Sequence, residues 1–175
     1  MRLIVGITGA SGVHFGLKIL SLLPKNITPF LIVSDNAKEV FKHETSHLYD
    51  DKDISAPIAS GSFPSDAMII APCSMNTLAK ISCGIADNLI TRTASVMIKE
   101  QRPLLLAPRE MPFSVIALEN MLKLSRLGII IAPPILGYYS EQESLNEMED
   151  FIIGKWFDLL KIKHNLYKRW KIEEA

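Results

Sequence analysis

Three short segments of small and hydroxyl-bearing residues are candidates for binding a ligand. The first reads Gly6-Ile7-Thr8-Gly9-Ala10-Ser11-Gly12. Glycines let the backbone turn tightly and approach a ligand, and N–H groups at a helix start, with the Thr8 and Ser11 hydroxyls, would bind a phosphate. The spacing fits neither the dinucleotide pattern G-x-G-x-x-G nor a triphosphate loop ending in G-K-[ST]. A mononucleotide phosphate suits the segment better, and a structural turn without a ligand is the alternative.

The other two segments also lie directly before predicted helices. The residues from Ala71 to Thr77 read A-P-C-S-M-N-T, and Ser34 stands before Asp35-Asn36-Ala37 as a typical helix N-cap. Helix capping alone would explain each segment separately. Their recurrence at three strand ends instead indicates a flat, phosphate-bearing cofactor across one sheet edge, because doubly wound sheets bind ligands at the carboxyl ends of their strands.

A parallel sheet flanked by helices must position these segments, because short apolar runs alternate with longer helical patterns. The runs are almost continuously apolar, as expected of strands covered on both faces. The predicted strands are Leu3–Ile7, Pro29–Val33, Ala67–Ala71, Leu104–Ala107 and Ile129–Ala132. The predicted helices are His14–Leu23, Asp35–His47, Asn76–Ile81, Asp87–Glu100, Phe113–Leu127 and Ser144–Leu160. We therefore expect an α/β fold, with one doubly wound, Rossmann-like parallel sheet, helices on both faces and a C-terminal helical arm.

Length and composition favour one domain over residues 1–175, with the arm at about 144–175. Hydrophobic residues make up 48% and charged residues 22% of the chain, as in ordinary globular proteins. Nineteen basic residues balance nineteen acidic ones, so no nucleic-acid partner is expected, and the Lys161–Lys171 stretch is interpreted as a solvated arm. No apolar run has the length of a membrane span and no secretory signal is visible, so we expect a cytoplasmic protein.

The sequence predicts no metal site. Cys73 and Cys83 have no second Cys/His pair at zinc spacing, so we expect two small buried residues. His43 and His47 lie four apart on a predicted helix but lack a third ligand. The acidic cluster Asp50-Asp51-Lys52-Asp53 is interrupted by a lysine and is interpreted as a solvated turn.

A series of further segments follows in one order along nearly the whole chain. They are Thr8-Gly9-Ala10-Ser11-Gly12, Ala59-Ser60-Gly61-Ser62, Pro72-Cys73-Ser74 with Thr77-Leu78, Asp87-Asn88-Leu89-Ile90 with Arg92, Lys99-Glu100 with Arg102-Pro103-Leu104, Pro108-Arg109-Glu110 with Pro112, Glu119-Asn120-Met121, Pro133-Pro134 and Gly137-Tyr138-Tyr139. In type and order they resemble the UbiX family of flavin prenyltransferases, from about residue 2 to Trp170. Several motifs in one order are far more specific than a single glycine loop.

The resemblance implies an activity, partners and a set of site residues. UbiX enzymes join the dimethylallyl group of dimethylallyl phosphate to reduced FMN at N5 and C6, and release phosphate. The prenylated FMN serves a UbiD-type decarboxylase in pathways such as ubiquinone biosynthesis, and the enzymes form closed homo-oligomers, dodecamers, with sites at subunit contacts. The residues implied to bind FMN are Gly9, Ala10, Ser11, Ser34, Ser74, Met75, Asn76, Thr77 and Arg92. Those implied around the prenyl donor are Lys99, Arg109, Tyr139 and Lys155 at its phosphate, Glu44 and Glu110 beside the reacting centre, and Trp170 near the substrate.

The implied residue types suit this chemistry. Breaking the C–O bond develops negative charge on the phosphate, which the three cations and the phenol hydroxyl would stabilise without a metal. Ring closure at C6 requires removal of a proton, which suits a carboxylate. Glu110 is the first candidate, and Glu44 is the second, as a proton relay or a group that orients the phosphate. On position alone, Arg109 and Glu110 could equally form a surface ion pair.

Some positions depart from the usual family pattern. Ser95 stands where aspartate is common, and Gln101 replaces an arginine. Lys155 stands where many members have arginine, so it keeps the charge but loses the bidentate fork. Ile54 and Ser55 occupy a stretch where some members have tryptophan, which points to a differently shaped prenyl pocket.

Two alternative functions remain open at this point. FMN-dependent cysteine decarboxylases share the fold and a P-x-S-x-N-T segment much like Pro72–Thr77, but they depend on a catalytic histidine and a P-x-M-N-x-x-M-W clamp. The chain has no such clamp. A non-catalytic flavin-binding protein would have no reason to hold Lys99, Arg109, Glu110 and Tyr139 together.

Overall fold

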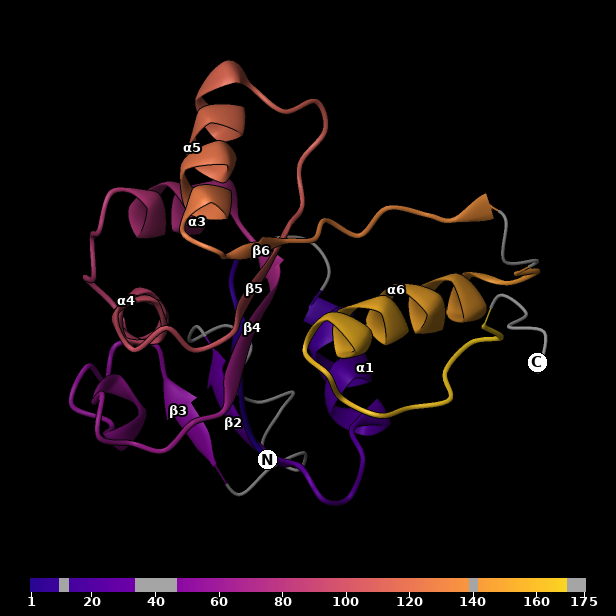
Figure 1. Cartoon of the computed structure of the whole chain (residues 1–175), viewed down its shortest axis with the longest axis horizontal. Helices are drawn as coiled ribbons and strands as arrows, with labels where there is room; N and C mark the ends of the chain where they lie inside the picture. The colour runs from indigo at the N-terminus through magenta and orange to yellow at the C-terminus, as the bar shows by residue number, and fades with distance from the viewer. Residues whose placement is uncertain (10–12, 34–46, 139–141, 170–175) are drawn as a thin grey trace. The chain divides into compact units, whose positions relative to one another are not determined.

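Parallel strands form a doubly wound sheet in the computed structural model, which describes residues 1–9, 13–33, 47–138 and 142–169 (Figure 1). The strand order is β3-β2-β1-β4-β5-β6, and each neighbouring pair is parallel. In this order the chain reverses direction across the sheet between β1 and β4, which makes their carboxyl ends the switch point where ligands bind. The strands are β1 (Arg2–Ile7), β2 (Thr28–Val33), β3 (Leu48–Asp50), β4 (Ala67–Cys73), β5 (Leu104–Pro108) and β6 (Ile130–Ile131).

Helices cover both faces of this sheet. Figure 1 shows α1 on one face and α3, α4 and α5 on the other. The central strand β4 is buried along its whole length, and β1 is buried from Leu3 onward, as a sheet covered on both faces requires. The helices of the described residues are α1 (Val13–Leu22), η2 (Pro57–Ala59), α3 (Met75–Ser82), α4 (Leu89–Lys99), α5 (Val115–Arg126) and α6 (Leu145–Leu159).

The structure confirms the predicted fold class. At most ends of the helices and strands, the observed boundary differs from the predicted one by one or two residues. Gly128 ends α5 with a φ of 81°, a conformation that suits glycine. Sequence reasoning missed β3, because this edge strand has only three half-buried residues. His47 lies outside any helix, and its carbonyl oxygen accepts a 2.8 Å bond from the Leu31 N–H. The rest of the helix predicted over Asp35–His47 lies outside the described residues.

The loop after β3 fastens the start of α4 to the sheet through Asp51. Its carbonyl oxygen accepts from the Leu89 N–H at 2.7 Å, and its carboxylate accepts from the Ile90 N–H at 2.9 Å and from the Asn88 amide at 2.8 Å. Burial raises the pKa of Asp51, and the Ile90 N–H offsets part of that effect. The prediction of a solvated turn was therefore wrong for Asp51, although Asp53 is exposed.

Contacts among the described residues group the chain into two compact units, residues 1–133 and 134–175. The sheet and its helices make up the first unit. The second contains α6 and the segment after it, which returns to the same helix and places Tyr167 and His164 against Gly154. The prediction of one domain over 1–175 stays a prediction. No described helix is both long and apolar enough to cross a membrane.

Replacing Asp51 by alanine is expected to destabilise the protein by about 1 to 3 kcal/mol, because it leaves the Ile90 N–H and the Asn88 amide without their acceptor. Urea unfolding measures the loss. Asp53→Ala removes an exposed carboxylate from the same loop and should change stability by less than about 0.5 kcal/mol. Equal losses in the two variants would contradict an anchoring role for Asp51.

Candidate functional site

A buried hydroxyl joins the loops that follow β1 and β4 at the switch point. Thr8 Oγ1 donates to the Pro72 carbonyl oxygen at 2.9 Å and accepts the Ser74 N–H at 2.8 Å. The Thr8 N–H also donates to the Pro72 carbonyl at 3.3 Å. The two glycine- and hydroxyl-rich segments named from the sequence therefore form one edge, and Thr8 fixes their spacing.

The start of α3 gives this edge an anion-binding character. Ser74 is the N-cap, its Oγ accepting from the Thr77 N–H at 3.2 Å and lying 3.0 Å from Thr77 Oγ1. The first N–H groups of a helix have no partner within it and carry the positive end of the helix dipole. Met75 is half-buried and Asn76 is exposed, so ligands can reach this helix start. Gly9 is exposed, and an added Cβ there would meet no described atom within 4 Å.

The ends of β4 and β5 place two further predicted residues at the same edge. The Arg109 N–H donates to the Cys73 carbonyl at 3.2 Å, so the segment after β5 is joined to the residue directly before Ser74. Both Arg109 and Glu110 are exposed, and one Glu110 carboxylate oxygen accepts the Met111 N–H at 3.1 Å. The structure thus brings a guanidinium and a carboxylate to the edge formed by Thr8 and Ser74.

Arg92, in the first turns of α4, is a second cation near the carboxyl ends of the strands. The Asn88–Thr91 capping box and Asp51 hold this end of the helix beside the carboxyl end of β3. Arg92 is exposed, and neither Arg92 nor Arg109 forms an ion pair with a carboxylate of the described residues. Both guanidinium groups are therefore available to phosphate groups.

Lys99 lies at the opposite end of the sheet. It ends α4, just before the amino end of β5, whereas Arg109 follows the carboxyl end. Since β5 has five residues and strands rise about 3.3 Å per residue, roughly 16 Å separates the two ends. The Lys99 ammonium pairs with the Glu100 carboxylate at 2.7 Å. The structure does not bring Lys99 and Arg109 together within one chain.

Two of the segments named from the sequence, Ala59–Ser62 and the one that begins at Lys99, contact each other at this amino edge, and these contacts stabilise the fold. A Cβ on Gly61 would lie 2.8 Å from the Lys99 ammonium nitrogen and 2.5 Å from Glu100 Oε1, so only glycine fits there without a shift. Arg102 donates to the carbonyl oxygens of Gly61 at 2.8 Å and Phe63 at 2.6 Å, and to Ser65 Oγ at 3.0 Å. Arg102 is thus an anchor for the segment before β4.

The remaining predicted site residues lie elsewhere. Lys155 is exposed on α6 and belongs to the second unit. Outside the described residues lie Ala10, Ser11, Ser34, Glu44, Tyr139 and Trp170. Their roles stay predictions.

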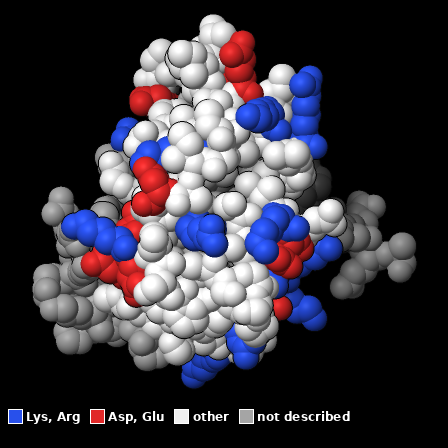
Figure 2. Space-filling view, turned by 90° about the vertical axis from the view of Figure 1, so that its left-hand side faces the viewer, with Lys and Arg blue, Asp and Glu red and all other residues white. Residues whose placement is uncertain are grey.

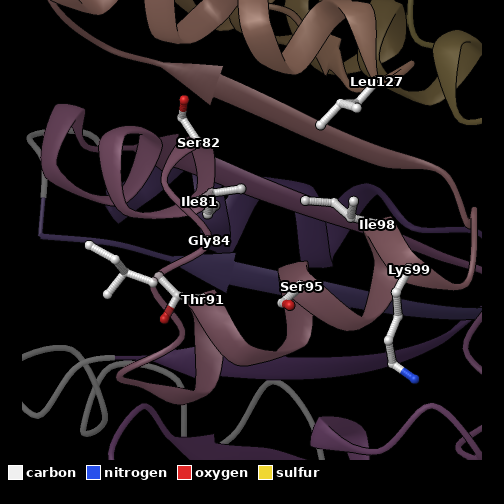
Figure 3. A pocket seen from close by; sticks show the side chains of 9 residues that line it. Ile81, Ser82, Gly84, Thr91, Ser95, Ile98, Lys99 and Leu127 are labelled. Carbon is white, nitrogen blue, oxygen red and sulfur yellow. The ribbon is translucent and has the colours of Figure 1, made fainter.

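A hollow of about 240 Å³ lies among α3, α4 and the end of α5 (Figure 3). Its lining includes Ile81, Ile98, Leu127 and Ser95, one of the departures from the family pattern. Lys99 also lines the hollow, but its side chain extends away from Ile81 and Ile98 in Figure 3 and its ammonium group pairs with Glu100. Charge is not concentrated on this side of the molecule either, because blue and red side chains lie scattered among uncharged ones in Figure 2. The hollow is therefore poorly suited to a phosphate-bearing ligand.

The cysteines divide into two environments. Cys73 is buried at the end of β4, and burial raises its thiol pKa to about 12, so it stays protonated at neutral pH. Cys83 is exposed as the C-cap of α3, which corrects the expectation that both are buried. Among the described residues, no three His, Cys, Asp or Glu side chains gather in a way that could hold a metal ion.

Known proteins resemble this chain over nearly its whole length. The Flavoprotein family model matches residues 1–156. The flavin prenyltransferase UbiX of Campylobacter jejuni is 48% identical over 185 residues, which cover 98% of this chain and 99% of that protein.

Solved structures agree over the same length. A dodecameric FMN-dependent UbiX-like decarboxylase from Escherichia coli O157:H7 matches with a TM-score of 0.92 and 38% identity, over 98% of this chain and 100% of that chain. AnUbiX in complex with FMN and dimethylallyl pyrophosphate matches with a TM-score of 0.91 and 38% identity, over 99% of this chain and 98% of that one. An FMN-dependent cysteine decarboxylase, at 20% identity and a TM-score of 0.66, shares the fold alone.

The match to a UbiX relative at 48% identity over nearly the full length of both chains is far stronger than the 20% identity to the cysteine decarboxylase. The chain belongs to the Flavoprotein family and, within it, to the UbiX flavin prenyltransferases.

Proposed function

We propose that this protein joins the dimethylallyl group of dimethylallyl phosphate to reduced FMN, with loss of phosphate. The observation that carries the proposal is the edge where Thr8 joins the β1 and β4 loops, with the start of α3, Arg109 and Glu110 beside it. The C. jejuni relative is named a flavin prenyltransferase, and AnUbiX was solved with FMN and a dimethylallyl donor.

The residues at this edge fit a flavin mononucleotide. The N–H groups at the start of α3 and the Arg92 guanidinium would hold its phosphate, while the open space beside Gly9 lets it approach the backbone. Ser74 and Thr77 would hold the helix start in place and contribute hydroxyl groups. We infer further contacts from Ala10, Ser11 and Ser34 through the family resemblance. Reduced FMN, when bound, supplies the nucleophilic N5 and C6 positions.

Arg109 and Glu110 would divide the chemistry at the prenyl donor. As the allylic C–O bond breaks, its electron pair leaves with the phosphate, and the Arg109 guanidinium stabilises the growing charge. Tyr139 and Lys155 would add a hydroxyl and an ammonium group. The Glu110 carboxylate would accept the proton displaced from C6 when the ring closes, with Glu44 as the second candidate. The ring-closing bond would form at the expense of the prenyl double bond, whose other carbon takes up a proton.

Lys99 would act in the site of a neighbouring copy, because its own chain holds it at the amino edge of the sheet. A homo-oligomer is consistent with α5, which exposes 71% of Val115, 71% of Ile116, 51% of Leu118 and 52% of Leu122. Exposed apolar surface of this extent is typical of a protein interface. The E. coli relative is dodecameric. We propose a closed assembly of the same kind.

The product would pass to a UbiD-type decarboxylase in the cytoplasm. Both the decarboxylase and the location follow from the family resemblance and the sequence. They are proposals, as is a reaction that proceeds without a metal.

Anaerobic incubation with reduced FMN and dimethylallyl phosphate is expected to give a flavin heavier by one five-carbon prenyl unit in mass spectrometry. Glu110→Gln should slow product formation by about 10²- to 10⁴-fold, because the amide cannot accept the proton. Glu143→Gln, which alters an exposed carboxylate beside α6, should leave the rate unchanged. A parallel reaction with dimethylallyl pyrophosphate tests the choice of donor.

A protein that binds FMN but yields no heavier flavin with either donor would contradict the proposed activity. The cysteine decarboxylase and carrier functions would then be the remaining candidates.

Mixing two inactive variants tests whether sites are shared between copies. Lys99→Met and Arg109→Met should each lose most activity, because each removes a cation from the donor phosphate site. If Lys99 comes from a neighbouring copy, hybrids reassembled from equal amounts should regain about a quarter of wild-type turnover. Hybrids that stay inactive, although both chains are present in one assembly, would contradict the shared site.

A further inference from the structure

A single residue of the loop after β3 holds the first turn of α4. Asp51 accepts the Leu89 N–H with its carbonyl oxygen, and its two carboxylate oxygens accept the Ile90 N–H and the Asn88 amide. The Leu89 and Ile90 N–H groups are among the first of the helix, which have no partner within it. Asp51 therefore fixes both the place and the direction of this helix start.

The same turn lies against β1 and exposes Arg92. Leu89 and Ile90 are almost completely buried, whereas Arg92 is exposed. A Cβ on Gly6 would lie 3.6 Å from two carbons of the Ile90 side chain, so Ile90 packs against β1 two residues before Thr8. Arg92 follows Ile90 by two residues, which corresponds to a rise of about 3 Å along the helix. The backbone of Arg92 is thus held near the strand whose carboxyl end leads into the loop fixed by Thr8.

Polar side chains also join this turn to the end of α3. The Lys80 ammonium, in the last turn of α3, pairs with the Asp87 carboxylate at 2.7 Å. Asp87 directly precedes the N-cap Asn88, whose side-chain oxygen accepts the Thr91 N–H at 2.9 Å and the Thr91 hydroxyl at 2.6 Å. The two helices that present the proposed phosphate-binding groups are therefore connected at this point.

The charge of Asp51 does not by itself favour its position. Burial raises the pKa of Asp51, as do the carboxylates of Asp50 and Asp87, whereas the Ile90 N–H and Lys80 lower it. A raised pKa means that folding favours the protonated form, so this group stabilises the fold most below its ordinary pKa of 3.8 and less as the pH rises through the raised value. What the carboxylate supplies at neutral pH is two acceptor oxygens that match two donors of the helix start.

We propose that Asp51 is a positioning residue that, through the first turn of α4, sets where the Arg92 guanidinium meets the phosphate of FMN. This role rests on the function proposed above, in which Arg92 binds that phosphate. Hydrogen bonds from a guanidinium to a phosphate depend on the alignment of its planar fork with the phosphate oxygens. A displaced helix start would misalign the fork, so Asp51 acts on the phosphate of the flavin and not on its ring.

The test is the binding of oxidised FMN, and of riboflavin as the same flavin without a phosphate, to Asp51→Asn. Asparagine has one acceptor oxygen, so it can serve the Ile90 N–H or the Asn88 amide but not both. In fluorescence titrations the Kd for FMN should rise about tenfold, while the Kd for riboflavin stays within about twofold of the wild type. Removing a negative charge would by itself strengthen the binding of an anion, so positioning and charge predict opposite signs.

Arg92→Met shows whether the two residues act together. It should weaken FMN binding and leave riboflavin binding unchanged, because it removes only a phosphate contact. In the Arg92→Met background, Asp51→Asn should raise the Kd for FMN no further, since both changes act through one side chain. Asp53→Asn makes the same change at an exposed carboxylate of the same loop and should leave both Kd values within about twofold of the wild type.

Asn88→Ser perturbs the attachment from the side of the helix. Serine keeps an N-cap hydroxyl but lacks the amide that Asp51 accepts. This variant should raise the Kd for FMN about threefold and leave riboflavin unchanged, and it tests the attachment even if Asp51→Asn does not fold. Circular dichroism checks that each variant is folded under the titration conditions.

Equal weakening of FMN and riboflavin binding, or an equal effect of Asp51→Asn with and without Arg92, would overturn the positioning role. So would wild-type FMN affinity in folded Asp51→Asn and Asn88→Ser proteins. Failure of the proposed function is distinguishable, because a protein that shows the expected binding pattern but transfers no prenyl group would contradict the activity alone. A wild-type protein that does not bind FMN would contradict both.

Discussion

A buried threonine hydroxyl sets the distance between the two loops on which the proposed ligand binding depends. Thr8 Oγ1 donates to the Pro72 carbonyl at the end of β4 and accepts the Ser74 N–H just after it, so the hydroxyl uses both its donor and an acceptor. The switch point of a doubly wound sheet is open by topology, because its neighbouring crossovers run to opposite faces. The hydroxyl fixes the width of that opening. It binds the Ser74 N–H at the start of α3, and the Arg109 N–H binds the carbonyl of the neighbouring Cys73, so both segments are positioned relative to Thr8.

The motifs named from the sequence lie at two different edges of the sheet. Those at the carboxyl edge, around Ser74 and Arg109, present N–H groups and charges outward. Those at the amino edge, around Gly61 and Arg102, are largely satisfied by each other. Lys99 is the exception, since it is an exposed cation on the structural edge. The homo-oligomer proposed above, with the amino edge of one copy beside the carboxyl edge of another, would give both edges a role in one site.

Much of the fold was predictable because strands buried on both faces leave long apolar runs, and five of these runs correspond to strands of the sheet. The short strand β3 was not, because three half-buried residues carry too little pattern. Asp51 was misjudged since its burial arises from the packing of α4, more than thirty residues later in the sequence. The position of Lys99, in contrast, could have been predicted from the sequence. Lys99 stands before a predicted strand and Arg109 follows that strand, so the two residues had to lie at opposite ends of it.

The central claim is that FMN binds at the edge fixed by Thr8, and an FMN titration of Thr8→Val beside Thr8→Ser tests it most directly. Valine keeps the shape but leaves the Ser74 N–H without its acceptor and the Pro72 carbonyl with only the longer bond from the Thr8 N–H, whereas serine keeps the hydroxyl. We predict that Thr8→Val weakens FMN binding at least about tenfold, the equivalent of about 1.4 kcal/mol, and that Thr8→Ser stays within about threefold of the wild type. Wild-type affinity in a folded Thr8→Val protein would contradict the claim.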